Sequence, residues 1–331
     1  MASGTTTDTD RAFAAALDAA RRAPNRPAAA DPASLALLAM AERIGARDVT
    51  VLIGGPTGTG KEGLARLIHS SSPRRDAPFV AVNCAALPEA MLEALLFGHE
   101  RGAFTGAQAA AKGLLRAAHG GTLLLDEVAE LPLGSQAKLL RALQEREVLA
   151  IGANTPVRID VRIVATANRD LAAEVAAGRF RADLFYRLAV FPLATTRLAA
   201  RRADILPIAA ALLLRLAGAN PPRPTATALA RLVAHDWPGN VRELGNVLER
   251  ALVHADGPRI EARDIVFDAG PQAETAVRSL PLQVQSHEHD MIRRTLSDCA
   301  GRRIDAARHL GISERTLRYK LAAMGAQATV Q

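Results

Sequence analysis

The sequence predicts a doubly wound α/β domain with a parallel sheet, followed by a helical subdomain and a separate all-α module at the C-terminal end. Three observations support this fold class. Short β-type runs alternate with helical patterns after residue 31, residues 199–266 keep helical spacing without a comparable strand, and residues 283–326 combine helical spacing with concentrated charge. Strands separated by helices favour a parallel sheet. The β-type runs are residues 49–53, 79–83, 122–125, 161–165 and 190–193.

The expected segments follow from these patterns. Near the start, an alanine-rich helical stretch precedes Pro24 and Pro27, which indicates a short helix or tether and argues against a folded regulatory domain. A stretch rich in Pro, Gly and small residues indicates a linker further on. The expected segments are the tether at 1–30, the α/β part at 31–198, the helical subdomain at 199–266, the linker at 267–282 and the terminal module at 283–331.

Length and composition restrict the class of protein. At ~100–200 residues per domain, 331 residues correspond to about two or three domains, and 49% hydrophobic residues exclude disorder over most of the chain. The 41 Lys and Arg residues against 34 Asp and Glu residues permit nucleic-acid binding without demonstrating it. Cys84 and Cys299 are too few and too far apart for a disulfide framework or a metal cluster, which suits a reducing cytosol.

The sequence carries no pattern of a membrane or secreted protein. The longest apolar run covers residues 205–214, and it is far shorter than the ~20 residues that span a bilayer. The polar, acidic start differs from a secretory signal peptide. We therefore expect a cytoplasmic protein that has no membrane partner.

A glycine-rich loop between a predicted strand and a predicted helix is the first candidate site. Its N–H groups and the helix N-terminus can surround phosphates, while a lysine reaches the β- and γ-phosphate oxygens. The chain has only four lysines, so a lysine here indicates that a compact ammonium is required. The alternative is a glycine-rich turn that binds nothing. The candidate nucleotide-binding residues are Gly55, Pro56, Thr57, Gly58, Thr59, Gly60, Lys61 and Glu62, the last standing where a Mg²⁺-binding Ser or Thr is usual.

Two carboxylates end the apolar run at residues 122–125. At a strand end beside the phosphate loop, Asp126 can hold Mg²⁺ directly or through water, and Glu127 can polarise the attacking water. The alternative is a buried strand that ends in a solvated acidic turn. Paired with the upstream loop, the carboxylates indicate hydrolysis of a nucleoside triphosphate.

Between these two motifs lies the hexapeptide GAFTGA at residues 102–107. Together with GPTGTGKE, VNCAAL, GGTLLLDE, GRFRADLFYRL and WPGNVREL, it makes residues 31–267 resemble the central domain of sigma-54-dependent transcriptional activators. The resemblance implies an AAA+ P-loop NTPase with a parallel sheet and a helical lid that uses ATP and Mg²⁺, and Glu62 is the family's own choice. It also implies that sigma-54 is contacted by Gly102, Ala103, Phe104, Thr105, Gly106 and Ala107.

The resemblance implies further site residues. Asn83 matches the asparagine that can bond Glu127 and hold it away from water, and Asn168 matches the sensor I asparagine. Arg181 and Arg187 match arginines presented to the γ-phosphate of a neighbouring subunit, which implies a hexameric ring. The lid residue Arg242 matches the sensor II arginine. For any one arginine alone, a solvated surface position is the default interpretation.

An exposed aromatic side chain on a glycine-flanked loop is costly unless it meets a partner. This favours a partner for Phe104, and the alternative is that Phe104 packs into its own domain.

The sequence also departs from the family pattern at several positions. The departures are Pro56, Arg116, the order Thr166-Ala167-Asn168, and residues 196–201. None removes a phosphate, metal or water ligand, so they bear on coupling and assembly more than on hydrolysis.

Residues 301–320 have the pattern of a helix-turn-helix. Apolar residues give the spacing of two short helices, Gly311 marks the turn and Ser313 suits an N-cap. Six Arg or Lys against two acids give this stretch a charge of +4, and it resembles the Fis-type DNA-binding domain of the same activators. A generic helical hairpin is the alternative. Dimers are expected, and the candidate DNA-binding residues are Arg302, Arg303, Ser313, Arg315, Thr316, Arg318, Tyr319 and Lys320.

Three functions compete at this point. The leading one is an activator that binds upstream DNA and uses ATP hydrolysis in a ring to convert closed complexes of sigma-54 RNA polymerase into open complexes. The second is a DNA-binding repressor or scaffold of the same fold that does not couple hydrolysis to sigma-54. The third, a protein-remodelling AAA+ chaperone, leaves the basic terminal module unexplained. Since no sensor domain is expected, we expect activity to be constitutive or controlled in trans by a separate protein.

Overall fold

The computed structural model describes residues 2–104 and 107–267. The chain divides into two compact units, residues 1–268 and 269–331, and the described residues belong to the first. The expected helix-turn-helix and its candidate DNA-binding residues lie outside the described residues. Within the described residues, no helix has both the length and the apolar composition to cross a membrane.

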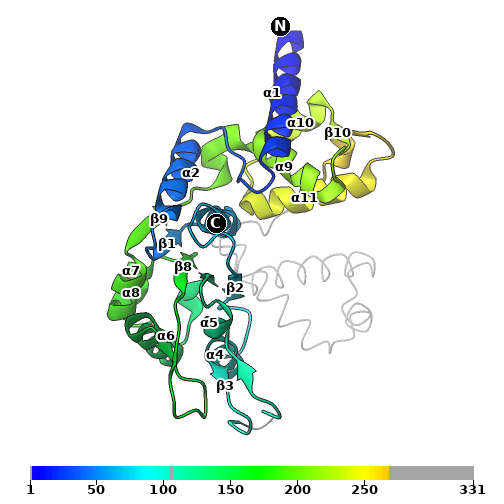
Figure 1. The fold of residues 1–331 in the computed structure, drawn as a ribbon. Coiled ribbons are helices and arrows are strands. Elements are labelled where there is room, and N and C mark those ends of the chain that lie inside the picture. The colour runs from blue at the N-terminus through cyan, green and yellow to red at the C-terminus, as the bar shows by residue number, and fades with distance from the viewer. Residues whose placement is uncertain (1, 105–106, 268–331) are drawn as a thin grey trace, which may run out of the picture. The chain divides into compact units, whose positions relative to one another are not determined.

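A five-stranded parallel sheet forms the centre of the α/β part (Figure 1). Its strand order is β2-β5-β8-β1-β9, and every neighbouring pair is parallel. The five expected β-type runs are therefore the five strands, with ends that shift by one or two residues. The strands are β1 (Val51–Gly54), β2 (Phe79–Asn83), β5 (Thr122–Asp126), β8 (Arg162–Ala167) and β9 (Phe191–Ala194).

Helices cover both faces of this sheet, and the strand residues alternate between two cores. In β5, Leu124 packs into a cluster with residues of α2 and α3, whereas Leu123 and Leu125 pack into a second cluster with residues of α4, α6 and α8. This alternation is what a strand with two buried faces requires. The helices are α2 (Pro32–Gly45), α3 (Lys61–Ser70), α4 (Glu89–Phe97), α5 (Leu114–Ala117), η1 (Val128–Glu130), α6 (Leu133–Glu145), α7 (Leu171–Ala176) and α8 (Ala182–Leu188).

Two short hairpins extend from the α/β part. One joins β3 (Gly98–His99) to β4 (Ala111–Lys112), and the other joins β6 (Glu147–Val148) to β7 (Val157–Arg158). The hairpins bond to each other, because Glu100 N–H donates to Ile151 O at 2.9 Å. The first hairpin carries the GAFTGA residues.

The helical lid comprises η2 (Leu198–Asp204), α9 (Ile205–Ala217), α10 (Ala226–Ala234), α11 (Asn240–His254) and η3 (Ala262–Asp264). Its own core surrounds the fully buried Trp237, whose Nε1–H donates to Leu232 O at 2.9 Å. The sequence analysis expected no strand comparable to those of the sheet here. The structure adds one two-residue parallel pair, β10 (Arg223–Pro224) with β11 (Arg259–Ile260), which is too short to produce a periodic pattern.

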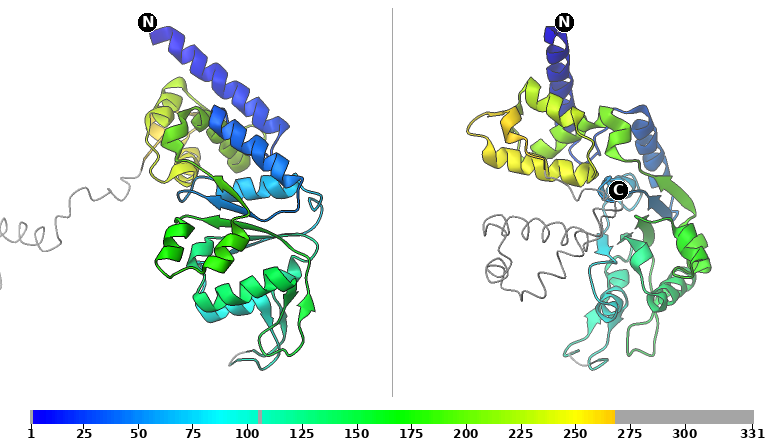
Figure 2. Two further views of the ribbon diagram at one scale, coloured as in Figure 1. Left: turned by 90° about the vertical axis from the view of Figure 1, so that its left-hand side faces the viewer. Right: turned by 180° about the vertical axis from the view of Figure 1, so that it is seen from behind.

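The first helix, α1 (Ala2–Arg22), is longer than the alanine-rich stretch that suggested it. Helix α1 lies against α9 and α10 of the lid (Figure 2). Its Phe13 and Leu17, one turn apart, are 5% and 2% exposed and pack into the lid core. Beyond α1, the buried carboxylate of Asp204 accepts bonds from the N–H groups of Ala30 and Asp31, at 2.6 and 2.7 Å. The segment at 1–30 is therefore packed against the lid along part of its length, which distinguishes it from a free tether.

Candidate functional site

The phosphate loop, residues 55–60, connects the end of β1, which lies between β8 and β9 in the sheet, to the start of α3. Gly55, Gly58 and Gly60 have φ angles of +138°, +76° and +99°, which side chains with a Cβ rarely adopt. The loop therefore needs glycine at these three positions. It delivers the chain to the first turn of α3, where free N–H groups favour an anion.

Lys61 is the first residue of α3, and its side chain folds back over the loop. Its Nζ donates to Gly55 O at 2.8 Å and to Pro56 O at 2.9 Å, and the residue is only 7% exposed. Burial lowers the pKa of Lys61, and the nearby charges of Asp126 and Glu127 oppose this shift. The Lys61 ammonium thus bonds to the loop backbone and lies within electrostatic reach of both carboxylates.

Asp126 and Glu127 lie at the carboxyl end of β5, next to β8 in the sheet. The hydroxyl of Thr166 on β8 donates to Asp126 Oδ1 and accepts from Glu127 N–H at 3.0 Å. Glu127 has left-handed backbone angles, φ 55° and ψ 49°, so its position depends on such support. One buried hydroxyl therefore holds both carboxylate-bearing residues.

From the sequence, Thr166 stands out only as a departure from the family pattern, and no role follows for it. A threonine in an otherwise apolar strand can be expected to be buried and to need hydrogen-bond partners, and Thr166 is fully buried here. Which residues it bonds depends on the pairing of β5 with β8, where Leu125 lies opposite Ala165.

The two candidate asparagines lie at the same edge of the sheet. Asn83 ends β2 opposite Asp126, and its Oδ1 accepts from Ala85 N–H at 2.8 Å. Among the described residues, no hydrogen bond joins Asn83 to Glu127. Asn168 follows β8, and its buried Oδ1 has no partner within the described part of the chain. Because Mg²⁺ and its bound waters prefer oxygen ligands, Asp126 and the unpaired Asn168 oxygen suit such an ion.

The three candidate arginines take two kinds of position. Arg242 lies in the first turn of α11, where its Cβ is 3.3 Å from a Cβ built at Gly58, and its charge helps lower the pKa of Lys61. Arg181 pairs with Asp183 at 2.7 Å, and Arg187 donates to Leu143 O at 2.9 Å. Both lie on the exposed side of α8 and its N-cap, so a second copy of the chain can reach them.

The GAFTGA loop closes at its base by hydrogen bonds between its own residues. Gly102 N–H donates to Ala107 O at 2.8 Å, and Ala107 N–H donates to Phe104 O at 3.0 Å. The Phe104 ring is 45% exposed, and its edge-to-face contact is with His99, with ring centroids 4.9 Å apart. Thr105 and Gly106 lie outside the described residues. Phe104 is thus not buried in its own domain, which favours a partner over the alternative interpretation.

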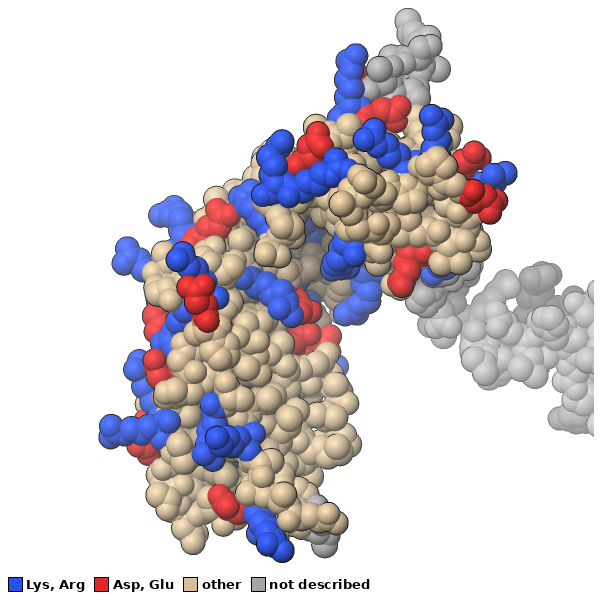
Figure 3. All heavy atoms as spheres, turned by 45° about the vertical axis from the view of Figure 1, so that its right-hand side comes forward, with Lys and Arg blue, Asp and Glu red and all other residues tan. Residues whose placement is uncertain are grey.

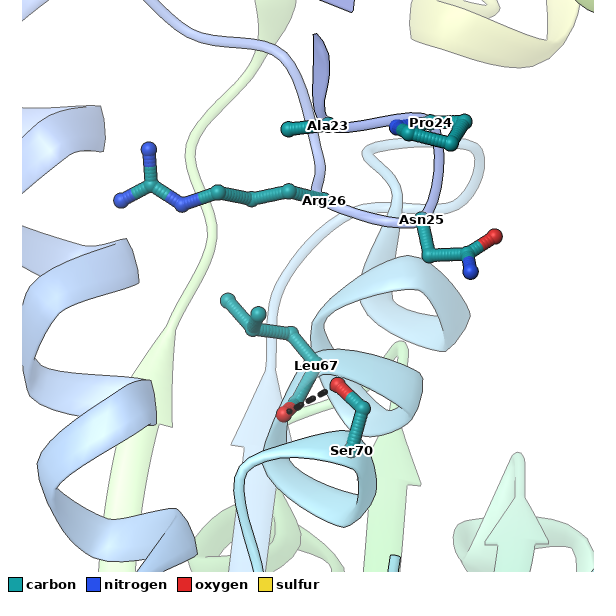
Figure 4. Close-up of a pocket in the computed structure, with 6 residues that line it drawn as sticks. All are labelled: Ala23, Pro24, Asn25, Arg26, Leu67 and Ser70. Atoms are coloured by element: carbon teal, nitrogen blue, oxygen red, sulfur yellow. Dashed lines mark hydrogen bonds between the residues drawn. The ribbon is translucent and has the colours of Figure 1, made fainter.

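A surface hollow of about 240 Å³ lies away from the candidate chemistry (Figure 4). It is beside the second half of α3, and Leu67 is six residues beyond Lys61, which corresponds to about 9 Å along the helix. No carboxylate lines it, so it does not suit triphosphate hydrolysis. Its lining residues are Ala23, Pro24, Asn25, Arg26, Leu67 and Ser70.

The charge distribution on the visible face of the described residues is mixed (Figure 3). Lys and Arg side chains are interspersed with Asp and Glu side chains, and this face has no large field of one sign. A continuous basic surface would be expected of a strong nonspecific DNA contact. The part of this face that the structure describes therefore offers no basic surface that competes with residues 283–331 as the expected DNA contact.

Comparison with protein families divides the chain in three. Residues 28–194 match the sigma-54 interaction domain, residues 199–280 match the AAA+ ATPase lid domain, and residues 284–324 match the bacterial regulatory proteins of the Fis family. The third match covers the segment in which the sequence analysis expected a Fis-type helix-turn-helix.

Individual proteins support the same grouping. The response regulator protein FleR of Pseudomonas aeruginosa is 50% identical over 332 residues, covering 90% of this chain and 70% of FleR. The regulatory protein AtoC of Escherichia coli is 46% identical over 308 residues, covering 89% and 66%. Among solved structures, NtrX from Brucella abortus gives a TM-score of 0.68 at 34% identity, covering 90% and 69%, and its complex with ATP gives 0.65.

These matches confirm the AAA+ fold with its parallel sheet and lid, and the Fis-type module, that the motifs predicted. The match to the sigma-54 interaction domain explains why a phosphate loop and a GAFTGA motif occur in one chain. The chain belongs to the family of sigma-54-dependent transcriptional regulators.

Proposed function

We propose that this protein activates transcription by hydrolysing ATP in a ring and driving the GAFTGA loop against sigma-54 in closed polymerase complexes. One observation carries the proposal: the phosphate loop with Lys61, the carboxylates Asp126 and Glu127, and an exposed Phe104 occur on the same α/β scaffold. A protein that has lost coupling would have no use for this aromatic ring, because exposed aromatic surface is costly.

In the nucleotide site, the phosphate loop binds the triphosphate through its N–H groups, and Lys61 leaves the carbonyls of Gly55 and Pro56 to bond the β- and γ-phosphates. Asp126, oriented by Thr166, would hold Mg²⁺, which neutralises developing charge on the phosphates when bound. Glu127 accepts the proton of the attacking water. The unpaired Asn168 oxygen orients that water or a water of the ion.

A second subunit completes the site in this proposal. The guanidinium groups of Arg181 and Arg187 lie on the exposed α8 region, and each has a bond that a neighbouring phosphate can replace. For Arg181 that bond is to Asp183, whose pKa the arginine lowers. An arginine supplied in trans is worth ~10³–10⁵ in rate. We therefore propose a hexameric ring, with ATP sites between its subunits.

The chain also provides a route from hydrolysis to the GAFTGA loop. Asn83 ends β2 beside Asp126, and α4 begins six residues later, at Glu89. Helix α4 ends at Phe97, directly before the β3–β4 hairpin that carries Phe104. When Asn83 exchanges its bond to Ala85 for one to Glu127, the shift passes along α4 to this hairpin.

Residues 283–331 bind upstream DNA in this proposal, and residues 284–324 within them match the Fis family of bacterial regulatory proteins. Removal of these residues is expected to abolish retention on a cognate site while the ATPase activity at high protein concentration persists. Equal DNA retention by the shortened chain would contradict the assignment.

The function is tested with purified protein, ATP, a cognate DNA site and sigma-54 RNA polymerase. Permanganate footprinting of the promoter is expected to detect strand opening only when both ATP and the protein are present. Binding to DNA with ATP hydrolysis but without opening would support the second candidate, a repressor or scaffold, and would contradict the activator.

A further inference from the structure

Three donors from the lid bond three successive carbonyls of the phosphate loop. Asn240 Nδ2 donates to Thr57 O at 3.0 Å, and Val241 N–H donates to Gly58 O at 2.8 Å. The guanidinium of Arg201 donates to Thr59 O at 2.6 Å. The lid and the loop are thus joined through the loop backbone.

Peptide geometry gives these bonds a consequence for phosphate binding. In a planar trans peptide, the carbonyl of one residue and the N–H of the next point in opposite directions. Bonds to the carbonyls of residues 57–59 therefore orient the N–H groups of residues 58–60 away from the lid donors. No described residue accepts a hydrogen bond from these three N–H groups, which leaves them available to an anion.

Asn240 is built into this junction. It is 3% exposed, and its left-handed φ of 56° is a conformation that asparagine and glycine tolerate best. Its Oδ1 accepts from Leu198 N–H at 2.8 Å, while its Nδ2 donates to Thr57 O and, at 3.4 Å, to Pro238 O. The amide therefore connects the beginning of the lid, the beginning of α11 and the phosphate loop.

The other two contacts are equally specific. A Cβ at Gly58 would lie 2.5 Å from Gly239 O, so only glycine permits this approach of the loop to α11. Arg201 also forms an ion pair within the lid, since its Nη1 lies 3.4 Å from the buried carboxylate of Asp204. A movement of these lid residues would therefore either break the three bonds or displace the loop backbone.

We propose that Asn240 is a positioning residue, which orients the phosphate loop for nucleotide binding and so makes nucleotide affinity depend on the position of the lid. This inference rests on the proposed ATPase function. Arg242 on the same helix faces the nucleotide in that function, whereas Asn240 acts through the loop backbone. A change in lid position then alters phosphate affinity without any change in the residues that touch phosphate.

Two substitutions separate this role from ordinary structural support. Asn240→Asp retains the size, the tolerance of positive φ and the acceptor for Leu198 N–H, but it loses the donor for Thr57 O. Asn240→Gly retains the backbone conformation, adds no charge and removes both side-chain bonds. Asn246→Asp makes the same change in charge at an exposed position of α11 and serves as the control.

The measurement is calorimetric titration of the full-length protein with ADP, together with its thermal unfolding midpoint without nucleotide. Since a hydrogen bond contributes about 0.5–1.5 kcal/mol, each Asn240 variant is expected to bind ADP about two- to tenfold more weakly. The unfolding midpoint of Asn240→Asp is expected to fall, because its carboxylate is buried against carbonyl oxygens, so binding is measured at a temperature at which every variant is folded. Asn246→Asp is expected to bind like the wild type.

Each other outcome is decisive. If only Asn240→Gly weakens binding, the Leu198 bond matters and the loop bond does not, which overturns the inference. If only Asn240→Asp weakens binding, the added charge is the cause, which also overturns it. A wild-type protein that binds no ADP would overturn the proposed function, and the inference with it, whereas normal binding by both variants would overturn the inference alone.

Discussion

The phosphate loop and the GAFTGA loop are both glycine-rich, but they are supported in different ways. Every carbonyl of the phosphate loop accepts a hydrogen bond: from Lys61, from the lid, or, at Gly60, from Leu64 N–H. The GAFTGA loop is bonded at its base through Gly102 and Ala107, and its aromatic side chain is 45% exposed.

This difference matches two physical tasks. A site that stabilises charge must have its dipoles oriented before the substrate arrives, because reorientation costs free energy. A surface that engages a partner must instead remain accessible until the partner is present. Substitutions near the phosphate loop should therefore reduce ATP hydrolysis strongly, and substitutions in the GAFTGA loop should reduce it little.

The largest loss is expected from Glu127→Gln. This substitution keeps the size of the side chain but removes the proton acceptor, so kcat for ATP hydrolysis should fall by about 10²–10⁴-fold. Binding of ATP should persist, because the loop and Lys61 are unchanged. Steady-state hydrolysis and equilibrium binding check the two parts, and an unchanged kcat would contradict the catalytic assignment.

A smaller loss is expected from Thr166→Val, which replaces the hydroxyl that bonds Asp126 and Glu127 with a methyl group of similar size. Residues that orient a metal ligand typically contribute 10–100-fold, so activity should fall by about that factor, with a higher Mg²⁺ requirement. Thr166→Ser keeps the hydroxyl and is expected to restore most of the activity. Equal losses in both variants would indicate a packing defect instead.

Little loss of hydrolysis is expected from Phe104→Ala. Phe104 is 45% exposed, its ring contacts that of His99, and it belongs to none of the buried core clusters, so neither the nucleotide site nor the core depends on it. The ATPase rate without sigma-54 should stay within about twofold, and the free energy of unfolding should change by no more than about 0.5 kcal/mol, as for most surface substitutions. A large fall in basal hydrolysis would show that the two loops are not separable in this way.

The rigidity of the region around the nucleotide site can be tested without measuring hydrolysis, because the thiol of Cys84 provides a probe. It follows Asn83, is 2% exposed, and burial raises its pKa to about 12, which keeps the thiol protonated at neutral pH. In a Cys299→Ser background, Cys84 should react with a thiol reagent at pH 8 only after denaturation. Rapid labelling of the native protein would show that this end opens readily.

Much of the fold could be predicted because its signals are local. Short apolar runs between helical patterns predict the strands, and the glycines with Lys61 predict the phosphate loop. Both signals depend on residues that are close in sequence. The bonds of Thr166 and Asn240 could not be predicted in this way. Asn240 is 183 residues from Thr57, and no periodicity records which backbone atoms two distant segments bring together.

The length of α1 was underestimated for a related reason. Residues before Ala12 contain several threonines and aspartates, which have low helix propensity, whereas the burial of Phe13 and Leu17 against the lid supplies stability that a propensity argument omits. The assignments of Arg181 and Arg187 remain predictions, because their proposed phosphate partner belongs to another subunit.

The most direct test of the account compares promoter opening with ATP hydrolysis in the wild type and Phe104→Ala. Both proteins are mixed with sigma-54 RNA polymerase, a cognate site and ATP, and permanganate footprints are read at equal rates of hydrolysis. The wild type is expected to open the promoter, and Phe104→Ala is expected to give no opening. Opening by Phe104→Ala at the wild-type level would contradict the claim that hydrolysis acts through this loop.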